Sequence, residues 1–453
     1  MRQGQYRLLV VLSTAALVAA LAACSSDDGT DPRTLTIATV DNVDLERLRD
    51  LSDAFTEEHP DLSLEWVVQG ENEIRQTIST DVGTQAGRFD VVSVGTYESE
   101  VWAGSDYLTP LTDMPDEFDT DEFIPATRDA LSHDGTLQAA PFYGESLVTM
   151  YRRDVLDDAG IEMPDNPTWR DILDVADQIT DTTDASGIAP VCVRGKSGWG
   201  ENVASLSAMA HAYGARWFDE DWSAQLDSSE WTETFEDYVA LADHAPDNVT
   251  EMGYQENLEA FAAGDCAVWV DTSVAASYLT DPEQSSVSDD VEFTRAPTSE
   301  EGRSTSWLWS WALAIPESSD NKELAKEFIT WATSNDYTEL VTSEYGWANV
   351  PPGARADLYD NPDYLDAASF APLVLASIEN ADVDAPATDP VPYVGIQYVA
   401  IPGFQSLGTA VGQQLVDAIS GEQSVGVAQD RSQWVANEII GQSQMINESS
   451  EME

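Results

Sequence analysis

One stretch near the start of the chain limits the fold more than any other feature. β-rich runs at 35–40, 62–68 and 90–95 alternate with apolar residues at helical spacing over 45–57 and 73–85. The inward positions of the third run are nearly all apolar, which is typical of a strand in a buried parallel sheet. Strand, helix, strand, helix and strand in this order predict a doubly wound α/β lobe, which binds ligands at the carboxyl ends of its strands.

The stretch 139–151 predicts that the chain leaves this lobe. Two short apolar runs, 139–142 and 147–151, flank Gly144, a residue that tolerates unusual backbone angles. We interpret the stretch as a crossing to a second lobe, with Tyr143 and Glu145 facing a ligand between the lobes. An ordinary hairpin with a surface glutamate is the alternative.

The second half of the chain repeats the mixture of strands and helices. Strands are expected at 189–194 and 264–271, with a third extended run at 304–316 that carries alternating tryptophans. Helices are expected at 169–179, 203–213, 231–242, 254–262 and 321–332, with 407–419 as the final helix. The elements between residues 169 and 271 predict a second α/β lobe.

The N-terminus has the pattern of a targeting segment. Arg2 and Arg7 precede an apolar run, 8–23, that is too short to span a bilayer comfortably. Small residues stand directly before Cys24, as in a bacterial lipobox. We therefore expect a signal peptide at 1–23, lipidation of Cys24, a tether at 24–33 and a protein held at the extracellular face of the membrane. A secreted protein with a chance cysteine is the alternative.

Two further cysteines remain, Cys192 and Cys266. An exported chain meets an oxidising environment, and an even number of cysteines favours pairing. We predict a disulfide between them.

The charge of the chain is unusual: 83 acidic residues stand against 20 basic ones, for a net charge of −63. Such a surface repels nucleic acid phosphates and anionic lipids. Adaptation to high salt explains it, because screening weakens self-repulsion and acidic groups keep the surface hydrated. An acidic chain that binds a cation is the alternative.

Several kinds of chemistry have no support in the sequence. The four histidines are scattered without metal-ligand spacing, so no metal or other cofactor is expected. The Gly195-Lys196-Ser197 turn has Pro190 where a phosphate-binding loop needs glycine, and no Gly-x-Ser-x-Gly motif occurs. One enzymatic alternative stays open: a secreted glycoside hydrolase that uses two of Glu145, Glu201 and Asp271 as acid and base.

Several motifs together resemble a known family. The lipobox, Ala140-Pro-Phe-Tyr-Gly-Glu145, Arg194-Gly-Lys-Ser-Gly-Trp-Gly-Glu-Asn202, the tryptophan run 307–316 and the Pro-Pro segment 346–353 resemble extracellular solute-binding proteins of ABC importers. The sorbitol/mannitol-binding branch is the most similar. The resemblance covers essentially everything after the tether.

The resemblance implies two α/β lobes that close about a hinge over one ligand. It implies a first lobe of 34–143 plus 306–348 and a second lobe of 144–305 plus 349–453. It also implies a sugar alcohol or monosaccharide as ligand, permease subunits as partners, and a monomeric binding protein that is not an enzyme.

A polyol site needs polar groups that donate and accept in pairs, and rings that cover C–H faces. The strand ends, the crossing and the glycine-rich turn supply these candidates: Asn42, Glu71, Arg75, Tyr97, Glu98, Tyr143, Glu145, Arg194, Lys196, Trp199, Glu201, Asp271, Trp307, Trp309, Trp347, Asn349, Tyr393 and Gln397. For Trp309 and Trp311 core packing is the alternative, and for Glu71 with Arg75 an exposed helix pair. A cationic ligand such as a polyamine is the second rival to a polyol.

Overall fold

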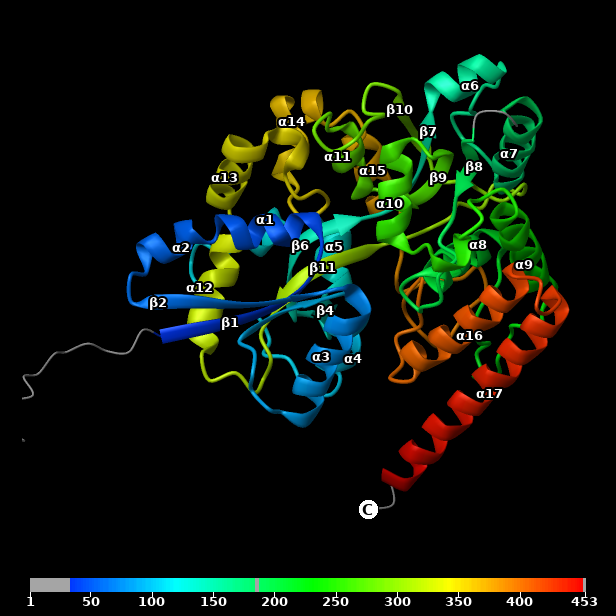
Figure 1. Cartoon of the computed structure of the whole chain (residues 1–453). Coiled ribbons are helices and arrows are strands. Elements are labelled where there is room, and N and C mark those ends of the chain that lie inside the picture. The colour runs from blue at the N-terminus through cyan, green and yellow to red at the C-terminus, as the bar shows by residue number, and fades with distance from the viewer. Residues whose placement is uncertain (1–32, 184–186, 451–453) are drawn as a thin grey trace, which may run out of the picture.

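The computed structural model describes residues 33–183 and 187–450. The predicted signal peptide, Cys24 and the tether up to residue 32 lie outside these residues. Arg33, which we assigned to the tether, is the first residue of strand β1 (Arg33–Val40). Two α/β bodies lie side by side, each built around its own sheet (Figure 1). Among the described residues, no helix is both long and apolar enough to cross a bilayer.

The first sheet has the strand order β2-β1-β3-β11-β6. Strands β1, β2 (Leu62–Gln69) and β3 (Val91–Val94) are parallel, as the doubly wound pattern predicts. Strand β11 (Trp309–Ala314) runs antiparallel between β3 and β6 (Ala139–Glu145). A chain segment more than 150 residues downstream of β6 thus completes the first sheet.

The helices of the first body cover this sheet. They are α1 (Val43–Leu51), α2 (Asp53–Glu58), α3 (Glu71–Thr84), α4 (Thr96–Ala103), α5 (Pro125–Ala130), α12 (Lys322–Ala332) and α13 (Asn335–Tyr345), with a small hairpin β4 (Ser132–His133) and β5 (Thr136–Leu137). The single helix predicted over 45–57 is wrong. The chain breaks at Ser52, whose hydroxyl donates to the carbonyl of Arg49 at 2.6 Å and so competes with the helical bonds.

The predicted crossing is confirmed. Strand β6 belongs to the first sheet and β7 (Leu147–Arg152) to the second, with Ser146 alone between them. Because β6 stays in the first sheet through Glu145, the change of sheet falls at Ser146 rather than at the 143–144 boundary.

The second sheet has the order β10-β7-β9-β8, with β10 (Val291–Arg295), β9 (Cys266–Thr272) and β8 (Ala189–Cys192). Strands β8 and β9 are parallel neighbours, and a disulfide joins Cys192 to Cys266 with 5.6 Å between their Cα atoms. The helices of this body are α6 (Arg153–Ala159), α7 (Trp169–Thr183), α8 (Asn202–Tyr213), α9 (Ser229–Ala242), α10 (Tyr254–Ala263), α11 (Ala275–Thr280), α16 (Phe404–Ile419) and α17 (Val425–Ser450). Helix α14 (Pro362–Ala367) packs against the 3-10 turns at 347–349 and 357–360, and α15 (Ala371–Glu379) contacts α5 and β6 of the first body and β7 of the second.

The helix predicted at 407–419 is α16, but it is not the final helix. The longer α17 follows it and packs against α16 and α9 (Figure 1). Short 3-10 turns complete the fold: η1 (Thr120–Glu122), η2 (Val249–Glu251), η3 (Trp347–Asn349) and η4 (Asp357–Asp360).

The segment after residue 349 does not belong wholly to the second body. The amide of Gly144 donates to the carbonyl of Pro352, and the amide of Ile124 donates to the carbonyl of Ala354, each at 2.8 Å. The backbones approach so closely that a Cβ on Gly144 would lie 2.5 Å from the carbonyl oxygen of Gly353. This segment therefore packs beside the crossing, against the first body, although the expected division placed 349–453 in the second lobe.

Candidate functional site

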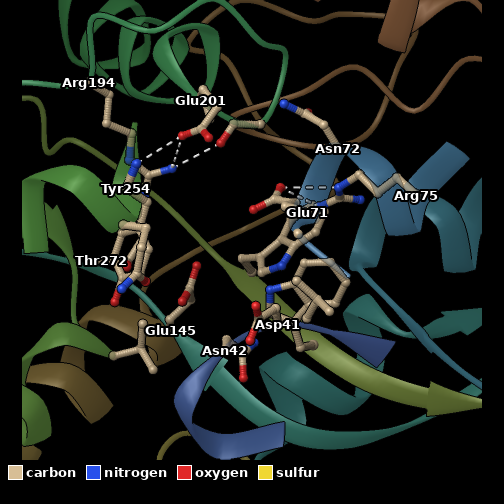
Figure 2. A pocket seen from close by; sticks show the side chains of 18 of the residues that line it. Asp41, Asn42, Glu71, Asn72, Arg75, Glu145, Arg194, Glu201, Tyr254 and Thr272 are labelled. Atoms are coloured by element: carbon tan, nitrogen blue, oxygen red, sulfur yellow. Dashed lines mark hydrogen bonds and ion pairs between the residues drawn. The ribbon is translucent and has the colours of Figure 1, made fainter. Parts of the chain in front are cut away.

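A cavity of about 580 Å³ lies between the two bodies and is lined by both (Figure 2). The first body contributes Asp41 and Asn42 after β1 and Glu71 after β2, at the carboxyl ends of parallel strands. The amide oxygen of Asn42 caps α1 through the amide of Leu45, at 3.0 Å, and its NH₂ group donates to the Tyr143 hydroxyl at 3.1 Å. The expectation that ligand-binding residues follow the carboxyl ends of parallel strands, here called the strand-end rule, thus located this wall correctly.

An aromatic wall surrounds the guanidinium of Arg75. Trp309 and Trp311 stand two residues apart on β11, so both project from the same face of the sheet. The Arg75 guanidinium carbon lies 5.0 and 4.7 Å from their ring centroids and 4.4 Å from that of Trp199, which comes from the other body. The two β11 tryptophans are buried as core residues are, but they also line the cavity.

Arg75 is not part of an exposed helix pair. Only 7% of it is exposed; its guanidinium bonds to the carboxylate of Glu98 and lies 3.0 Å from Glu71 Oε1. Burial lowers the pKa of Arg75, but the charges of Glu98 and Glu71 outweigh burial and hold that pKa above its usual value. Glu98 lies behind the cavity wall and acts on the ligand side only through Arg75.

Arg194 anchors the wall of the second body. Its guanidinium donates a hydrogen bond to each carboxylate oxygen of Asp271, at 2.8 and 2.5 Å, and lies 3.8 Å from the carboxylate of Glu201. Asp271 is therefore the buried counter-charge of Arg194 and not a residue of the cavity wall, which its neighbour Thr272 forms instead. Burial raises the pKa of Glu201 to about 7, although Arg194 acts in the opposite direction.

Glu145 stands at the crossing and projects toward the cavity between the bodies (Figure 2). Among the described residues, no side chain or backbone group makes a hydrogen bond of normal geometry to its carboxyl group, although the Trp307 indole faces it. Burial raises the pKa of Glu145 to about 8, against the opposing charge of Arg194. Near neutral pH this carboxyl group can both donate and accept a hydrogen bond.

Three other buried polar atoms of the cavity wall have no hydrogen-bond partner in the described part of the chain. They are the indole nitrogen of Trp307, the hydroxyl of Thr272 and the amide oxygen of Gln397. Buried polar groups in native proteins are normally paired. Together with Glu145, these donors and acceptors suit a small molecule that carries several hydroxyl groups.

Most of the predicted site residues line this cavity: Asn42, Glu71, Arg75, Tyr143, Glu145, Arg194, Lys196, Trp199, Glu201, Trp307, Trp309 and Gln397. Other predictions are wrong, because the residues lie elsewhere. Tyr97 packs behind Trp199, with 5.0 Å between ring centroids, and its hydroxyl donates to the carbonyl of Ile401. The Tyr393 hydroxyl accepts a hydrogen bond from the amide of Trp217, away from the cavity.

The Pro-Pro segment also misses the cavity. Asn349 accepts a hydrogen bond from Arg47 at 2.5 Å, and Trp347 lines a separate hollow of about 290 Å³ beside α13. Both residues belong to η3, which directly follows α13 of the first body. The Pro-Pro segment was a poor guide to the ligand site, because it packs against β6, where the amide of Gly144 donates to the carbonyl of Pro352.

Several wall residues were missed. Tyr254 opens α10 and lies 5.0 Å from the Arg194 guanidinium carbon, measured to its ring centroid. No strand precedes it, so the strand-end rule could not find it. Asp41 and Thr272, in contrast, are direct neighbours of predicted residues at strand ends, and the rule applied one residue more widely would have included them.

The comparisons with known proteins agree with this geometry. A family model described as "Bacterial extracellular solute-binding protein" matches residues 43–339. The chain belongs to this family, whose members bind solutes and are not enzymes, so the glycoside hydrolase alternative is wrong.

Two similar proteins are each 46% identical in sequence to the chain over the aligned residues. One is a mannitol-binding protein of Pseudomonas aeruginosa, aligned over 392 residues that cover 86% of this chain and 89% of that protein. The other is an ABC transporter solute-binding protein from Agrobacterium vitis S4, whose crystal structure contains D-mannitol. It superimposes with a TM-score of 0.88 over 91% of this chain and 99% of that one. A ribitol complex from Agrobacterium radiobacter K84, 23% identical with a TM-score of 0.80, covers 90% of this chain and 99% of its own, and shows the fold alone.

Proposed function

We propose that this chain is the binding component of an ABC importer that captures a linear sugar alcohol, with D-mannitol as the first candidate. The observation that carries the proposal is the set of unpaired polar groups at Trp307, Thr272 and Gln397, which lie with Glu145 beside an aromatic wall. The two relatives that are 46% identical, one named for mannitol and one solved with it, support the same ligand class.

An alditol matches these groups because each carbon carries a hydroxyl group and a C–H face. Trp199, Trp309 and Trp311 offer rings for the C–H faces, while Glu145 and its unpaired neighbours exchange hydrogen bonds with the hydroxyl groups. The other cavity residues we predicted, among them Lys196 and Glu201, are proposed ligand contacts on the same grounds.

Isothermal titration and thermal-shift measurements in high salt will test the ligand. We expect D-mannitol to bind saturably with one site and to raise the melting temperature, because a ligand at about a thousand times its Kd stabilises the folded state by about 4 kcal/mol. D-glucitol and ribitol should bind in the same cavity, and maltose weakly. Tight binding of spermidine without any alditol response would instead favour the polyamine alternative.

We propose that ligand binding closes the two lobes about the crossing at Ser146. Arg75, Trp309 and Trp311 come from the first body, and Trp199 from the second completes their cage. A Cβ on Gly200 of the second body would lie 2.6 Å from Glu71 Oε1 of the first. These contacts join the bodies directly above the cavity and would form only on closure.

Replacing Trp199 by alanine should weaken mannitol binding about 30-fold, since the loss of a buried ring and its cation–π contact costs about 2 kcal/mol. Small-angle scattering should show less ligand-dependent compaction than in the wild type. Trp434, 63% exposed on α17, supplies the control, because Trp434→Ala removes the same ring without touching the lobe contact. Unchanged affinity and compaction in Trp199→Ala would contradict the closure proposal.

We further propose that the protein acts as a monomer held by lipid on Cys24 at the extracellular face of the membrane and delivers its ligand to permease subunits. The lipobox pattern and the family's extracellular description support this location. The net charge of −63 supports a high-salt habitat, where screening makes such a surface tolerable.

A further inference from the structure

The cavity carries far more negative than positive groups. Eight carboxyl groups line it, against three cationic side chains. Each cation already has a carboxylate partner within the protein: Arg75 has Glu71 and Glu98, Arg194 has Asp271, and Lys196 has Glu256 at 3.0 Å. No positive charge of the wall is therefore left for an anionic ligand, whereas several carboxyl groups have no cation of their own.

Glu145 is the most buried of the cavity carboxyl groups that have no cationic partner. It is 6% exposed, it faces the cavity, and no described group makes a hydrogen bond of normal geometry to it (Figure 2). Arg194 is the cation that acts on Glu145 most strongly, but its Nε and Nη2 donate to Asp271 and its Nη1 donates to the carbonyl of Gly200. Because ionising a buried carboxyl group without a partner is costly, Glu145 stays largely protonated near neutral pH, and a ligand that brings a positive charge would stabilise its ionised form.

We propose, building on the alditol function above, that the cavity binds amino-alditols, in which an alkylammonium replaces a terminal hydroxyl, more tightly than the neutral alditol of the same length. The ammonium group lies against Glu145 and donates charge-assisted hydrogen bonds to it. The same surplus of carboxyl groups excludes aldonates, whose terminal carboxylate would be a like charge in a buried site.

The groups that face Glu145 set the pH range of this preference. Burial raises its pKa most; Arg194 lowers it, Asp271 and Glu71 raise it further, and the Trp307 indole lowers it. The phenols of Tyr143 and Tyr254 stay neutral because burial holds their pKa values well above the usual range. Since the pKa of Glu145 is about 8 without ligand, binding of the ammonium ion displaces a proton from the carboxyl group near neutral pH. The preference should therefore increase from pH 6 to pH 8.5, while an alkylamine stays charged up to about pH 10.

A series that differs only at carbon 1 tests the inference: D-glucitol, 1-amino-1-deoxy-D-glucitol and D-gluconate, with D-mannitol as the reference ligand. Calorimetry at pH 8 in fixed high salt should show the amino-alditol binding at least about tenfold more tightly than D-glucitol, and gluconate not at all. Titrations near pH 7 in two buffers of different ionisation enthalpy should reveal proton release with the amino-alditol only.

Matched variants locate the effect. Glu145→Gln should reduce the ratio of the two affinities to about one, whereas Glu57→Gln, an equal change of charge on the exposed side of α2, should keep the wild-type ratio. An amino-alditol that binds no more tightly than D-glucitol to the wild type overturns the inference, and so does a ratio that survives Glu145→Gln. If neither mannitol nor glucitol binds, the proposed function itself fails; if they bind and the amino-alditol does not, only this inference fails.

Discussion

Replacing Arg194 by methionine will lower the free energy of unfolding by about 3–5 kcal/mol. The reason is the partner left behind, because Asp271 is 1% exposed and receives two hydrogen bonds from the guanidinium. Methionine fills much of the space but supplies no charge, so a carboxylate would remain buried without compensation. Urea titration at fixed high salt, followed by tryptophan fluorescence and circular dichroism, measures the loss.

Two control variants test whether the loss of stability comes from the unpaired Asp271 carboxylate. The double variant Arg194→Met with Asp271→Leu should regain most of the lost stability, since removing both members of a buried pair is often close to neutral. Arg153→Met breaks solvent-exposed ion pairs with Asp290, at 3.0 Å, and with Glu292, at 3.2 Å, and should lower the stability far less than Arg194→Met does. Equal losses in Arg194→Met and Arg153→Met would show that Asp271 does not depend on its partner.

The ligand-free protein should lose stability as the pH rises from 5 to 9. The pKa of Glu145 in the folded state is about 8, above its ordinary value of 4.5, so the folded protein holds a proton that the unfolded chain has lost between these values. The stabilisation is complete below about pH 4.5 and is lost as the pH rises through 8, with a span on the order of 5 kcal/mol. Glu201, with a pKa of about 7, acts in the same direction.

The variant Glu145→Gln isolates this contribution. Surface repulsion among the many acidic groups also changes with pH, but it is common to both proteins and cancels in their difference. We expect the stability of Glu145→Gln to fall much less steeply between pH 6 and pH 9. Identical pH profiles for variant and wild type would mean that the Glu145 carboxyl group titrates normally in the folded protein.

Local patterns were enough to predict much of the fold. Strand β1, β2 and β3 with their helices, and the passage from one sheet to the other at residues 139–151, followed from periodicity and turn chemistry. Periodicity failed where its signal was weak. Helix α17 is largely polar and is stabilised by packing against α16 and α9, while the break at Ser52 depends on one side-chain hydrogen bond.

For the site, the sequence by itself determined which residues stand at strand ends and at the crossing, and Asn42, Glu71, Tyr143 and Glu145 do line the cavity. Strand ends and crossings are local features, so local patterns can locate them. Only the tertiary structure decided depth and pairing. In the folded protein Asp271 pairs with Arg194, and Tyr97 packs behind Trp199. Tyr254 lies in the cavity wall, although no local pattern indicated it. Such roles depend on groups far apart in the chain, and burial and distance between those groups decide whether a carboxylate binds a ligand or neutralises an arginine.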